Sequence, residues 1–138
     1  MSCVFCEIVA GTAAASVVDR DDACTAFLDI QPINPGHLLV VPNAHATHLA
    51  DLDPEIGAGM FRMGQRLAAA LRVSGVRCEG IDLFLADGAA AGQEVFHVHL
   101  HVIPRFAGDG FGFTFPPDYR DKPPRAELDV IAKQIRGA

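Results

Sequence analysis

The sequence contains no cluster of basic residues and no long apolar run. Its 11 Lys and Arg residues are outnumbered by 17 Asp and Glu residues, which gives a formal net charge of −6. A protein that binds the phosphate backbone of nucleic acid needs a basic stripe, so nucleic acid is not an expected partner. Because no apolar run approaches the roughly 20 residues that cross a bilayer, we also expect no membrane-spanning segment.

A secretory signal and a disulfide framework are not expected either. Residues 1–12 contain no Lys or Arg and one acidic residue, Glu7, which is the wrong charge for a signal peptide. Four cysteines in 138 residues, without an export signal, are weak evidence for disulfide bonds. We therefore expect a cytoplasmic protein.

What is present is an ordinary globular composition. Apolar residues make up 50% of the chain and charged residues 20%, which is far from the composition of a disordered protein. A chain of this length buries roughly two-thirds of the surface that it exposes when unfolded. No repeat and no linker divides the chain before residue 107. We expect a single domain over residues 1–138, with residues 107–138 as a C-terminal arm and helix.

Local patterns predict one long helix among short strands. The helix begins with Asp53 as N-cap and Pro54 in the first position, and apolar residues then recur at spacings of three and four. Shorter patterns predict helices over residues 3–11 and 127–136, and strands over 16–19, 23–30, 37–42, 81–86 and 94–104. This order predicts an α+β fold, with a mainly antiparallel sheet of about five strands, one long helix and short terminal helices.

Half of the six histidines lie in one alternating segment, as His97, His99 and His101. Side chains on a strand alternate, so these three imidazoles share one face. The opposite face holds the apolar residues Phe96, Val98, Leu100 and Val102. Three imidazoles in strict alternation are difficult to explain as packing, so this segment predicts a functional site.

Three kinds of chemistry could use this row of imidazoles. A metal ion bound by all three is hard to build, because His97 and His101 lie about 13 Å apart on a straight strand. A solvent-exposed face that happens to be rich in histidine is not expected from the composition. A histidine that acts as nucleophile or general acid-base fits better, since neutral imidazole has a free lone pair near pH 7. A metal-dependent hydrolase stays as an alternative.

A glycine-containing loop precedes the histidine row. Gly88 and Gly92 lie within residues 87–94 and allow a close approach of the backbone, whose N–H groups could hold an anion. Next to three imidazoles, such a loop favours a phosphorylated substrate over an acyl substrate.

The segment 97–103 is similar to the His-x-His-x-His-x-x signature of the histidine triad (HIT) superfamily, with an apolar residue at each x. Further matching positions are Asp29, Pro32, Gly36-His37, Val41-Pro42, Asn43-Ala44-His45 and Gly92-Gln93. The resemblance runs from Cys3 to about Arg105 and is closest to the Hint-like bacterial branch of nucleoside phosphoramidate hydrolases. The transferase and phosphorylase branches replace the third histidine with Gln, which argues against them here.

The resemblance implies a HIT-like fold and a nucleotide hydrolase. It would cleave the α-phosphate bond of nucleoside phosphoramidates or related nucleotidyl conjugates through a covalent nucleotidyl-histidine, and release a nucleoside monophosphate. His99 would attack the phosphorus, while His97 and His101 would orient groups or share protons. The substrate would be a purine nucleotide and the protein a homodimer. The alternatives are a diadenosine polyphosphate hydrolase and a nucleotide-binding module with little turnover.

The resemblance also implies which residues contact the nucleotide. They are Asp29 for the ribose, Phe5, Ile8 and Phe27 for the base, and Gly88, Gly92, Gln93, Glu94, His99 and His101 for the phosphate. Glu94 departs from the family, because many relatives have Ser or Thr there. A carboxylate is repelled by phosphate unless it is protonated or turned away, but the backbone N–H of Glu94 can still serve.

Cys3 and Cys6 form a Cys-x-x-Cys pair, which is half of a zinc site. In bacterial members that this chain resembles, such a pair binds zinc together with two histidines, which correspond to His45 and His97. Four protein ligands leave no open position, so the implied ion is structural. The alternatives are a reduced pair of thiols with nothing bound, a redox pair, and a site in which His48 replaces His45.

Three further features are given plainer interpretations. His37 lies at the head of a buried strand, which is typical of a core histidine. The phenylalanines after residue 105 have near-alternate spacing, which fits a strand or an arm that packs on another subunit or on its own chain. Arg62, Arg66 and Arg72 indicate a solvated helix face.

Overall fold

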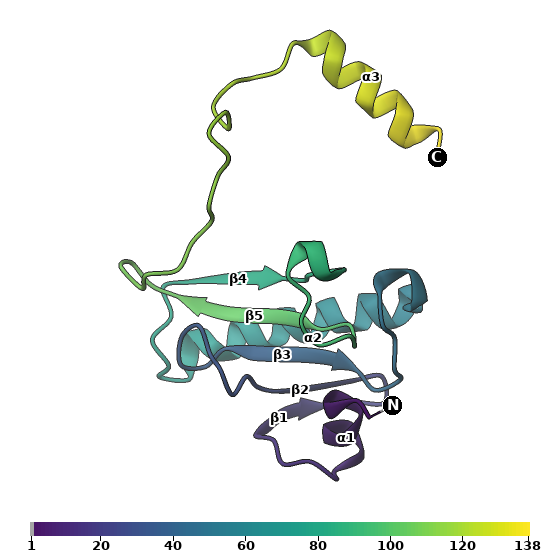
Figure 1. Cartoon of the computed structure of the whole chain (residues 1–138). Helices are drawn as coiled ribbons and strands as arrows, with labels where there is room; N and C mark the ends of the chain where they lie inside the picture. The colour runs from purple at the N-terminus through teal and green to yellow at the C-terminus, as the bar shows by residue number, and fades with distance from the viewer. Residues whose placement is uncertain (1) are drawn as a thin grey trace.

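The computed structural model describes residues 2–138 and contains one antiparallel sheet with three α-helices (Figure 1). The strands are β1 (Val17–Arg20), β2 (Cys24–Leu28), β3 (Leu38–Pro42), β4 (Gly80–Phe84) and β5 (Leu100–Arg105). The helices are α1 (Val4–Ala10), α2 (Pro54–Val73) and α3 (Arg125–Arg136), with the short 3-10 helices η1 (Leu49–Asp51) and η2 (Ala89–Ala91). The strand order is β1-β2-β3-β5-β4, and every neighbouring pair is antiparallel. The predicted α+β class, with a five-stranded sheet and one long helix, is confirmed.

The long helix α2 begins where the sequence predicts. The carboxylate of Asp53 accepts a hydrogen bond of 2.8 Å from the N–H of Glu55, and Pro54 occupies the first turn. The buried residues of α2 recur at spacings of three and four and are Met60, Met63, Gly64, Leu67 and Leu71. Each large side chain buried on this face stabilises the fold by about 1.5–3 kcal/mol.

The two faces of the sheet are covered by different helices. On one face, α2 closes a core that includes the sheet residues Cys24, Ala26, Leu38, Val40, Leu100 and Val102. On the other face, α1 packs Phe5 and Ile8 against Phe27, Leu39 and Val41. Because β3 contributes alternate residues to the two clusters, it is buried on both faces, as its continuous apolar run predicts.

The strand predicted over residues 94–104 begins only at Leu100. Residues 95–97 form a bend, so Phe96 leaves the core with an exposed fraction of 44% and lies 5.9 Å from the ring of His48. The apolar residues that follow it are buried under α2 as expected, at Val98, Leu100 and Val102. His97, at the end of this bend, lies beside Phe5 of α1, with the two ring centroids 5.8 Å apart.

Residues 29–37 form the loop between β2 and β3, and Gly36 fixes one side of it. The φ angle of Gly36 is +95°, and a Cβ atom there would lie 2.8 Å from Cγ1 of Val76. A residue with a side chain would therefore strain the backbone and collide with the segment after α2. The loop packs tightly at this point.

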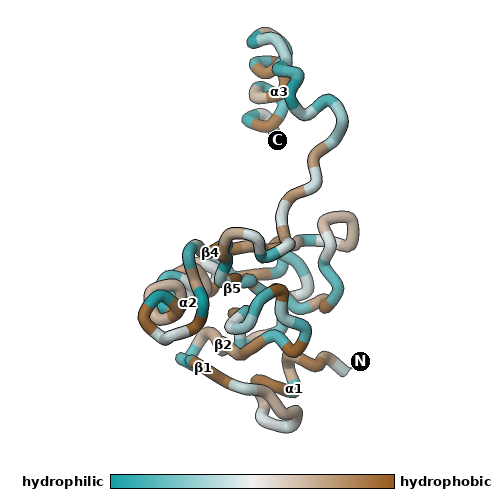
Figure 2. Tube along the Cα trace, turned by 90° about the vertical axis from the view of Figure 1, so that its left-hand side faces the viewer, coloured by the Kyte–Doolittle hydropathy of each residue, from teal (hydrophilic) through white to brown (hydrophobic). Residues whose placement is uncertain are grey.

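After β5, the chain continues into an arm that ends in α3. Figure 1 shows α3 standing apart from the sheet, and no side chain of α3 is buried. Brown and teal residues alternate around α3 in Figure 2, as in an amphipathic helix. Phe113 and Phe115 are exposed and lie outside the strands. None of the helices within residues 2–138 is long and apolar enough to cross a membrane.

Candidate functional site

The three imidazoles of the row meet three different environments. His97 is completely buried and faces the two N-terminal cysteines. His99 lies between its neighbours, with its ring centroid 4.9 Å from that of His101 and 5.2 Å from that of Phe5. His101 contacts His37 at the start of β3. The row therefore divides into a cysteine-facing, a central and a β3-facing imidazole.

The central imidazole has a defined proton position. Nδ1 of His99 lies 2.8 Å from the carbonyl oxygen of His97. A carbonyl can only accept, so Nδ1 must donate, and the lone pair of neutral His99 is on Nε2. A neutral imidazole with a free Nε2 lone pair can attack phosphorus without prior deprotonation.

The proton positions of His37 and His101 follow from the same reasoning. The N–H of Ile33 donates to Nδ1 of His37 at 3.0 Å, so the proton of His37 is on Nε2. Nε2 of His37 lies 2.8 Å from Nδ1 of His101 and donates to it. The remaining proton of neutral His101 is then on Nε2. His101 therefore offers a hydrogen-bond donor next to His99.

Burial keeps this pair of imidazoles neutral. It lowers the pKa of His37, although the carboxylate of Asp29, 3.6 Å away, acts in the opposite direction. Burial, followed by the nearby His99 and His37, lowers the pKa of His101 to about 4. Near pH 7 both rings are thus uncharged hydrogen-bonding groups.

His37 is a site residue that the sequence pattern does not identify. Its side chain is 2% exposed, as expected for a core histidine, but it bonds to the third histidine of the row. The pairing of β3 with β5 sets Leu39 opposite His101, which brings His37 to the same face. The order of strands in the sheet was the missing information.

Asp29, His37 and His101 could be taken for a metal site, since one ligand atom from each lies within 4.8 Å of the others. The proton positions argue against it. Nδ1 of His37 already accepts a hydrogen bond from Ile33, so Nε2 holds the proton and has no lone pair for a metal ion. His37 and His101 instead form a hydrogen-bonded chain with the N–H of Ile33, and Asp29 lies 3.6 Å from Nε2 of His37.

A second group of ligand atoms does fit a metal ion. It comprises Cys3, Cys6, His45 and His97. Nδ1 of His97 lies 3.4 Å from Sγ of Cys3 and 3.5 Å from Sγ of Cys6, and Nδ1 of His45 lies 3.3 Å from Sγ of Cys6. A tetrahedron with zinc bonds of about 2.0–2.3 Å has edges of about 3.3–3.8 Å. These separations match a four-ligand zinc site.

The surroundings of these histidines support the same conclusion. Nε2 of His97 donates to the carbonyl oxygen of Pro42 at 2.8 Å, which leaves the Nδ1 lone pair facing the cysteines. Nε2 of His45 lies 3.2 Å from Oγ1 of Thr47. His48 lies elsewhere, with its Nδ1 3.9 Å from a carboxylate oxygen of Asp51. The Cys/His cluster is compatible with zinc and uses His45.

The loop before the histidine row is held by its own hydrogen bonds. Gly88 and Gly92 have φ angles of +92° and +94°, which glycine adopts most readily. Gln93 is buried; its amide oxygen accepts from Gly88 N–H at 2.8 Å, and its amide nitrogen donates to the carbonyl oxygens of Thr47 and Val95. The Gln93 side chain therefore fixes the shape of the loop.

Glu94, which follows this loop, has an exposed side chain. Within the part of the chain that the structure describes, its backbone N–H donates to no protein acceptor. That N–H is free to bind an incoming anion.

The residues expected around the base lie together between α1 and the sheet. Phe5, Ile8 and Phe27 are all buried, and the rings of Phe5 and Phe27 are 5.4 Å apart. Phe5 contacts both His97 and His99 edge to face. The apolar cluster thus borders the central imidazole.

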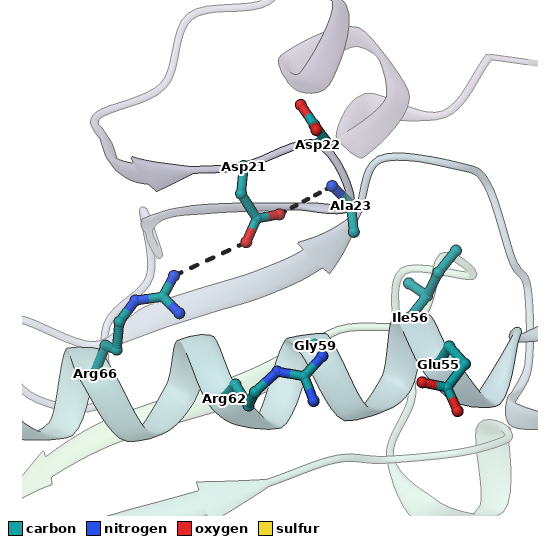
Figure 3. A pocket seen from close by; sticks show the side chains of 8 residues that line it. All are labelled: Asp21, Asp22, Ala23, Glu55, Ile56, Gly59, Arg62 and Arg66. Atoms are coloured by element: carbon teal, nitrogen blue, oxygen red, sulfur yellow. Dashed lines mark hydrogen bonds and ion pairs between the residues drawn. The ribbon is translucent and has the colours of Figure 1, made fainter.

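A separate open surface pocket of about 400 Å³, lined by several charged residues, lies between the β1–β2 turn and α2 (Figure 3). Arg66 spans it, 3.1 Å from a carboxylate oxygen of Asp19 and 3.8 Å from one of Asp21. The solvated helix face expected at Arg62, Arg66 and Arg72 is confirmed, since all three are exposed, and Arg66 also forms these ion pairs. None of the three triad histidines lines this pocket.

Comparisons with known proteins agree with the geometry. The HIT domain profile matches residues 10–108. An uncharacterized HIT-like protein of Mycobacterium tuberculosis is 46% identical over 134 residues, which cover 97% of this chain and 92% of the relative. The Arabidopsis thaliana protein named adenylylsulfatase HINT3 is 36% identical over 103 residues, which cover 75% of this chain and 52% of that protein.

Solved structures share the fold over most of its length. A zinc-bound histidine triad family protein from Mycobacterium smegmatis has a TM-score of 0.78 and 47% identity, covering 88% of this chain and 87% of that one. A histidine triad nucleotide-binding protein from Candida albicans has a TM-score of 0.86 and 25% identity, covering 99% of this chain and 96% of that one. The resemblance inferred from the motif is thereby confirmed: the chain belongs to the HIT domain family.

Proposed function

We propose that the protein is a nucleotide hydrolase that cleaves the α-phosphate bond of nucleoside phosphoramidates or related nucleotidyl conjugates. The hydrogen bond from Nδ1 of His99 to the carbonyl of His97 is the observation on which the proposal rests. It leaves the Nε2 lone pair of His99 as the available nucleophile. Membership of the HIT domain family supports nucleotide chemistry at this position.

The reaction has two displacement steps. In the first, Nε2 of His99 attacks the α-phosphorus, the bond from phosphorus to the leaving nitrogen breaks, and that nitrogen takes a proton from solvent and departs as an amine. In the second, water attacks the phosphorus and displaces His99, which releases the nucleoside monophosphate and returns a proton to solvent. Covalent catalysis of this kind divides one difficult displacement into two easier ones.

Two donors stabilise the charge on the transferring phosphoryl group. The Nε2–H of His101 donates a hydrogen bond to one non-bridging oxygen of the phosphoryl group. The backbone N–H of Glu94 donates to another. Fixed donors of this kind need no reorganisation during the reaction. Because His101 is neutral near pH 7, it acts as a hydrogen-bond donor here and not as a cation.

The remaining contacts orient the nucleotide. Asp29 binds the ribose hydroxyls, while Phe5, Ile8 and Phe27 form the apolar side of the purine pocket. The backbone from Gly88 to Gly92 borders the phosphate, with Gln93 holding that loop in shape. The side chain of Glu94 is exposed to solvent, which screens its repulsion from phosphate.

The Cys/His cluster would hold a structural zinc ion through Cys3, Cys6, His45 and His97. Bound there, the ion supplies cross-links between α1, the segment after β3 and the histidine row. The zinc-bound relative supports this assignment. All four cysteines of the chain are free thiols, which fits a reducing compartment such as the cytoplasm.

The protein would act as a homodimer. The amphipathic helix α3 exposes Leu128, Ile131 and Ile135 without covering them on its own chain. A second copy would cover this apolar face. Light scattering after size-exclusion chromatography tests this, with twice the chain mass expected and a single chain mass contradicting it.

The test of function is release of AMP from an adenosine phosphoramidate by the wild type and by His99→Ala. Diadenosine polyphosphates and adenylyl sulfate run in parallel, the latter because of the activity named for the Arabidopsis relative. His48→Ala, which changes a half-buried histidine outside the row, is the matched control. We expect phosphoramidate turnover in the wild type and the control, and none in His99→Ala.

Other outcomes separate the alternatives. Turnover of the dinucleotide alone would assign the neighbouring branch with the same nucleophile. AMP binding without turnover of any substrate would favour a nucleotide-binding module. Full turnover by His99→Ala would show that the nucleophile is wrongly assigned. Loss of turnover after chelation in a protein that stays folded would favour a metal-dependent hydrolase.

A further inference from the structure

The loop that carries His37 is held in place by hydrogen bonds to residues that lie far from the loop in the sequence. Within this loop, the N–H of Ile33 donates to Nδ1 of His37 and so decides which nitrogen of His37 holds the proton. The next residue, Asn34, is 5% exposed and belongs to no strand. Its side chain is therefore placed to determine where the N–H of Ile33 lies.

Both hydrogens of the Asn34 amide are donated to acceptors that lie far along the chain. Nδ2 donates to the carbonyl oxygen of Pro104 at 2.9 Å and to Oδ2 of Asp109 at 2.8 Å. Both partners can only accept, so the orientation of the amide is fixed by chemistry. Asn34 thus joins the loop to the end of β5 and to the first turn of the C-terminal arm.

Asp109 is a strong acceptor for this bond. Its side chain is 3% exposed and pairs with Arg105 through two hydrogen bonds, of 2.6 Å and 2.9 Å. Arg105 also binds Asp82 of β4 at 2.6 Å. The Arg105 guanidinium holds the pKa of Asp109 well below its usual range, so the carboxylate is ionised near pH 7.

We propose that Asn34 and Asp109 are positioning residues for the chemistry at His101. They hold the N–H of Ile33 against His37, which keeps the proton of His37 on Nε2 and that of His101 on its own Nε2. Neither side chain needs to touch the substrate. The effect on turnover rests on the proposed function, but the effect on the proton positions does not.

The direct test is the nitrogen chemical shifts of the histidine rings, measured in the wild type and in Asn34→Ala. The wild type should show Nε2–H on both His37 and His101. In Asn34→Ala, His37 should populate both neutral forms, and His101 should follow. Asp109→Asn, which keeps the size of the side chain but removes its charge, should change the same signals if Asn34→Ala proves too unstable to study.

The kinetic test uses the same variants with the adenosine phosphoramidate. We expect Asn34→Ala to lower kcat about tenfold and to leave KM within about twofold, because the loss falls on a transition-state donor. In a His37→Phe background the same substitution should have no further effect on kcat. Asp82→Asn is the matched control, since it removes the charge of a partner of Arg105 without changing the loop, and should leave kcat unchanged.

The outcomes separate this proposal from the proposed function. Unchanged ring proton positions in both Asn34→Ala and Asp109→Asn would overturn the proposal, whatever the activity. An additional loss of kcat in the His37→Phe background would also overturn it, because Asn34 would then act by another route. If the wild type hydrolyses no nucleotide but the ring proton positions change as expected, the proposed function fails and the positioning role stands.

Discussion

Nε2 of His37 and Nδ1 of His101 lie 2.8 Å apart, although 64 residues separate them in the chain. Because the N–H of Ile33 has already determined the proton position of His37, the direction of this hydrogen bond is also determined. His101 therefore faces His99 with an N–H donor on Nε2. The position of that proton is set by His37 and Ile33. The third histidine of the row depends on a residue from the loop that precedes the neighbouring strand.

Replacing His37 tests this dependence. We expect His37→Phe to lower kcat about tenfold to a hundredfold, because the His101 donor loses its fixed proton. The pKa of His101 should rise, since its neutral form loses a hydrogen-bond donor. NMR titration of the His101 ring measures this change, with His48→Phe as control. A titration midpoint of His101 unchanged from about 4 would contradict the prediction.

Stability should decrease on mild acidification. Burial lowers the pKa of His101 to about 4 in the folded state, whereas an unfolded histidine titrates near 6.5. The unfolded chain therefore binds the extra proton first, so the contribution is complete above about pH 6.5 and is lost as the pH falls toward 4. The contribution of the Asp109 carboxylate, whose pKa is depressed, is fully present throughout this window and is lost only at lower pH.

Thermal unfolding between pH 7.5 and 5 measures this effect. The melting temperature of the wild type should fall over this range, and that of His101→Gln should fall less. Comparing the two proteins removes the contribution of the Cys/His cluster, which both contain. Equal slopes for both proteins would show that His101 does not titrate as described.

The Cys/His cluster predicts one zinc ion per chain. Cys6→Ser should lose the ion, because Sγ of Cys6 lies within 3.5 Å of both ligand nitrogens, while Cys78→Ser should retain it. Loss of the ion should lower the melting temperature by about 10 °C. Elemental analysis and thermal unfolding check both statements. Retention of zinc by Cys6→Ser would mean that the ion is bound elsewhere.

Gly36→Ala should destabilise the protein by about 2–4 kcal/mol. Its φ of +95° is unfavourable for alanine, and the added Cβ would lie 2.8 Å from Val76. Gly11→Ala is the matched control, because Gly11 has a φ of +79° with no atom within 4 Å of the added Cβ, so only about 1 kcal/mol is expected. Chemical denaturation measures both. Equal losses would show that the collision at Gly36 relaxes without cost.

Local signals were sufficient for the elements and for the existence of the site. The Asp53–Pro54 start signal located α2 correctly, and strict alternation identified the histidine row. The Cys-x-x-Cys spacing identified half of the metal cluster, and the family resemblance supplied the two histidines that the structure brings to it.

The roles of individual imidazoles required long-range contacts. The alternating pattern does not distinguish the three histidines. In the structure, His97 lies in the bend at residues 95–97 and contacts Cys3. The pairing of β3 with β5 places His101 next to His37. The bond from Asn34 to Asp109 spans 75 residues and leaves no local pattern. Such contacts depend on strand order, which short-range periodicity does not contain.

His97 belongs to both halves of the site through different atoms. Its ring faces the cysteines, while its carbonyl oxygen holds the nucleophilic His99. Replacing the His97 side chain would therefore remove a metal ligand and also release the peptide that orients His99. A loss of turnover in that variant alone could come from either change. Cys6→Ser alters only the metal cluster. The pair of variants, compared at equal folded fraction, distinguishes metal loss from misorientation of His99.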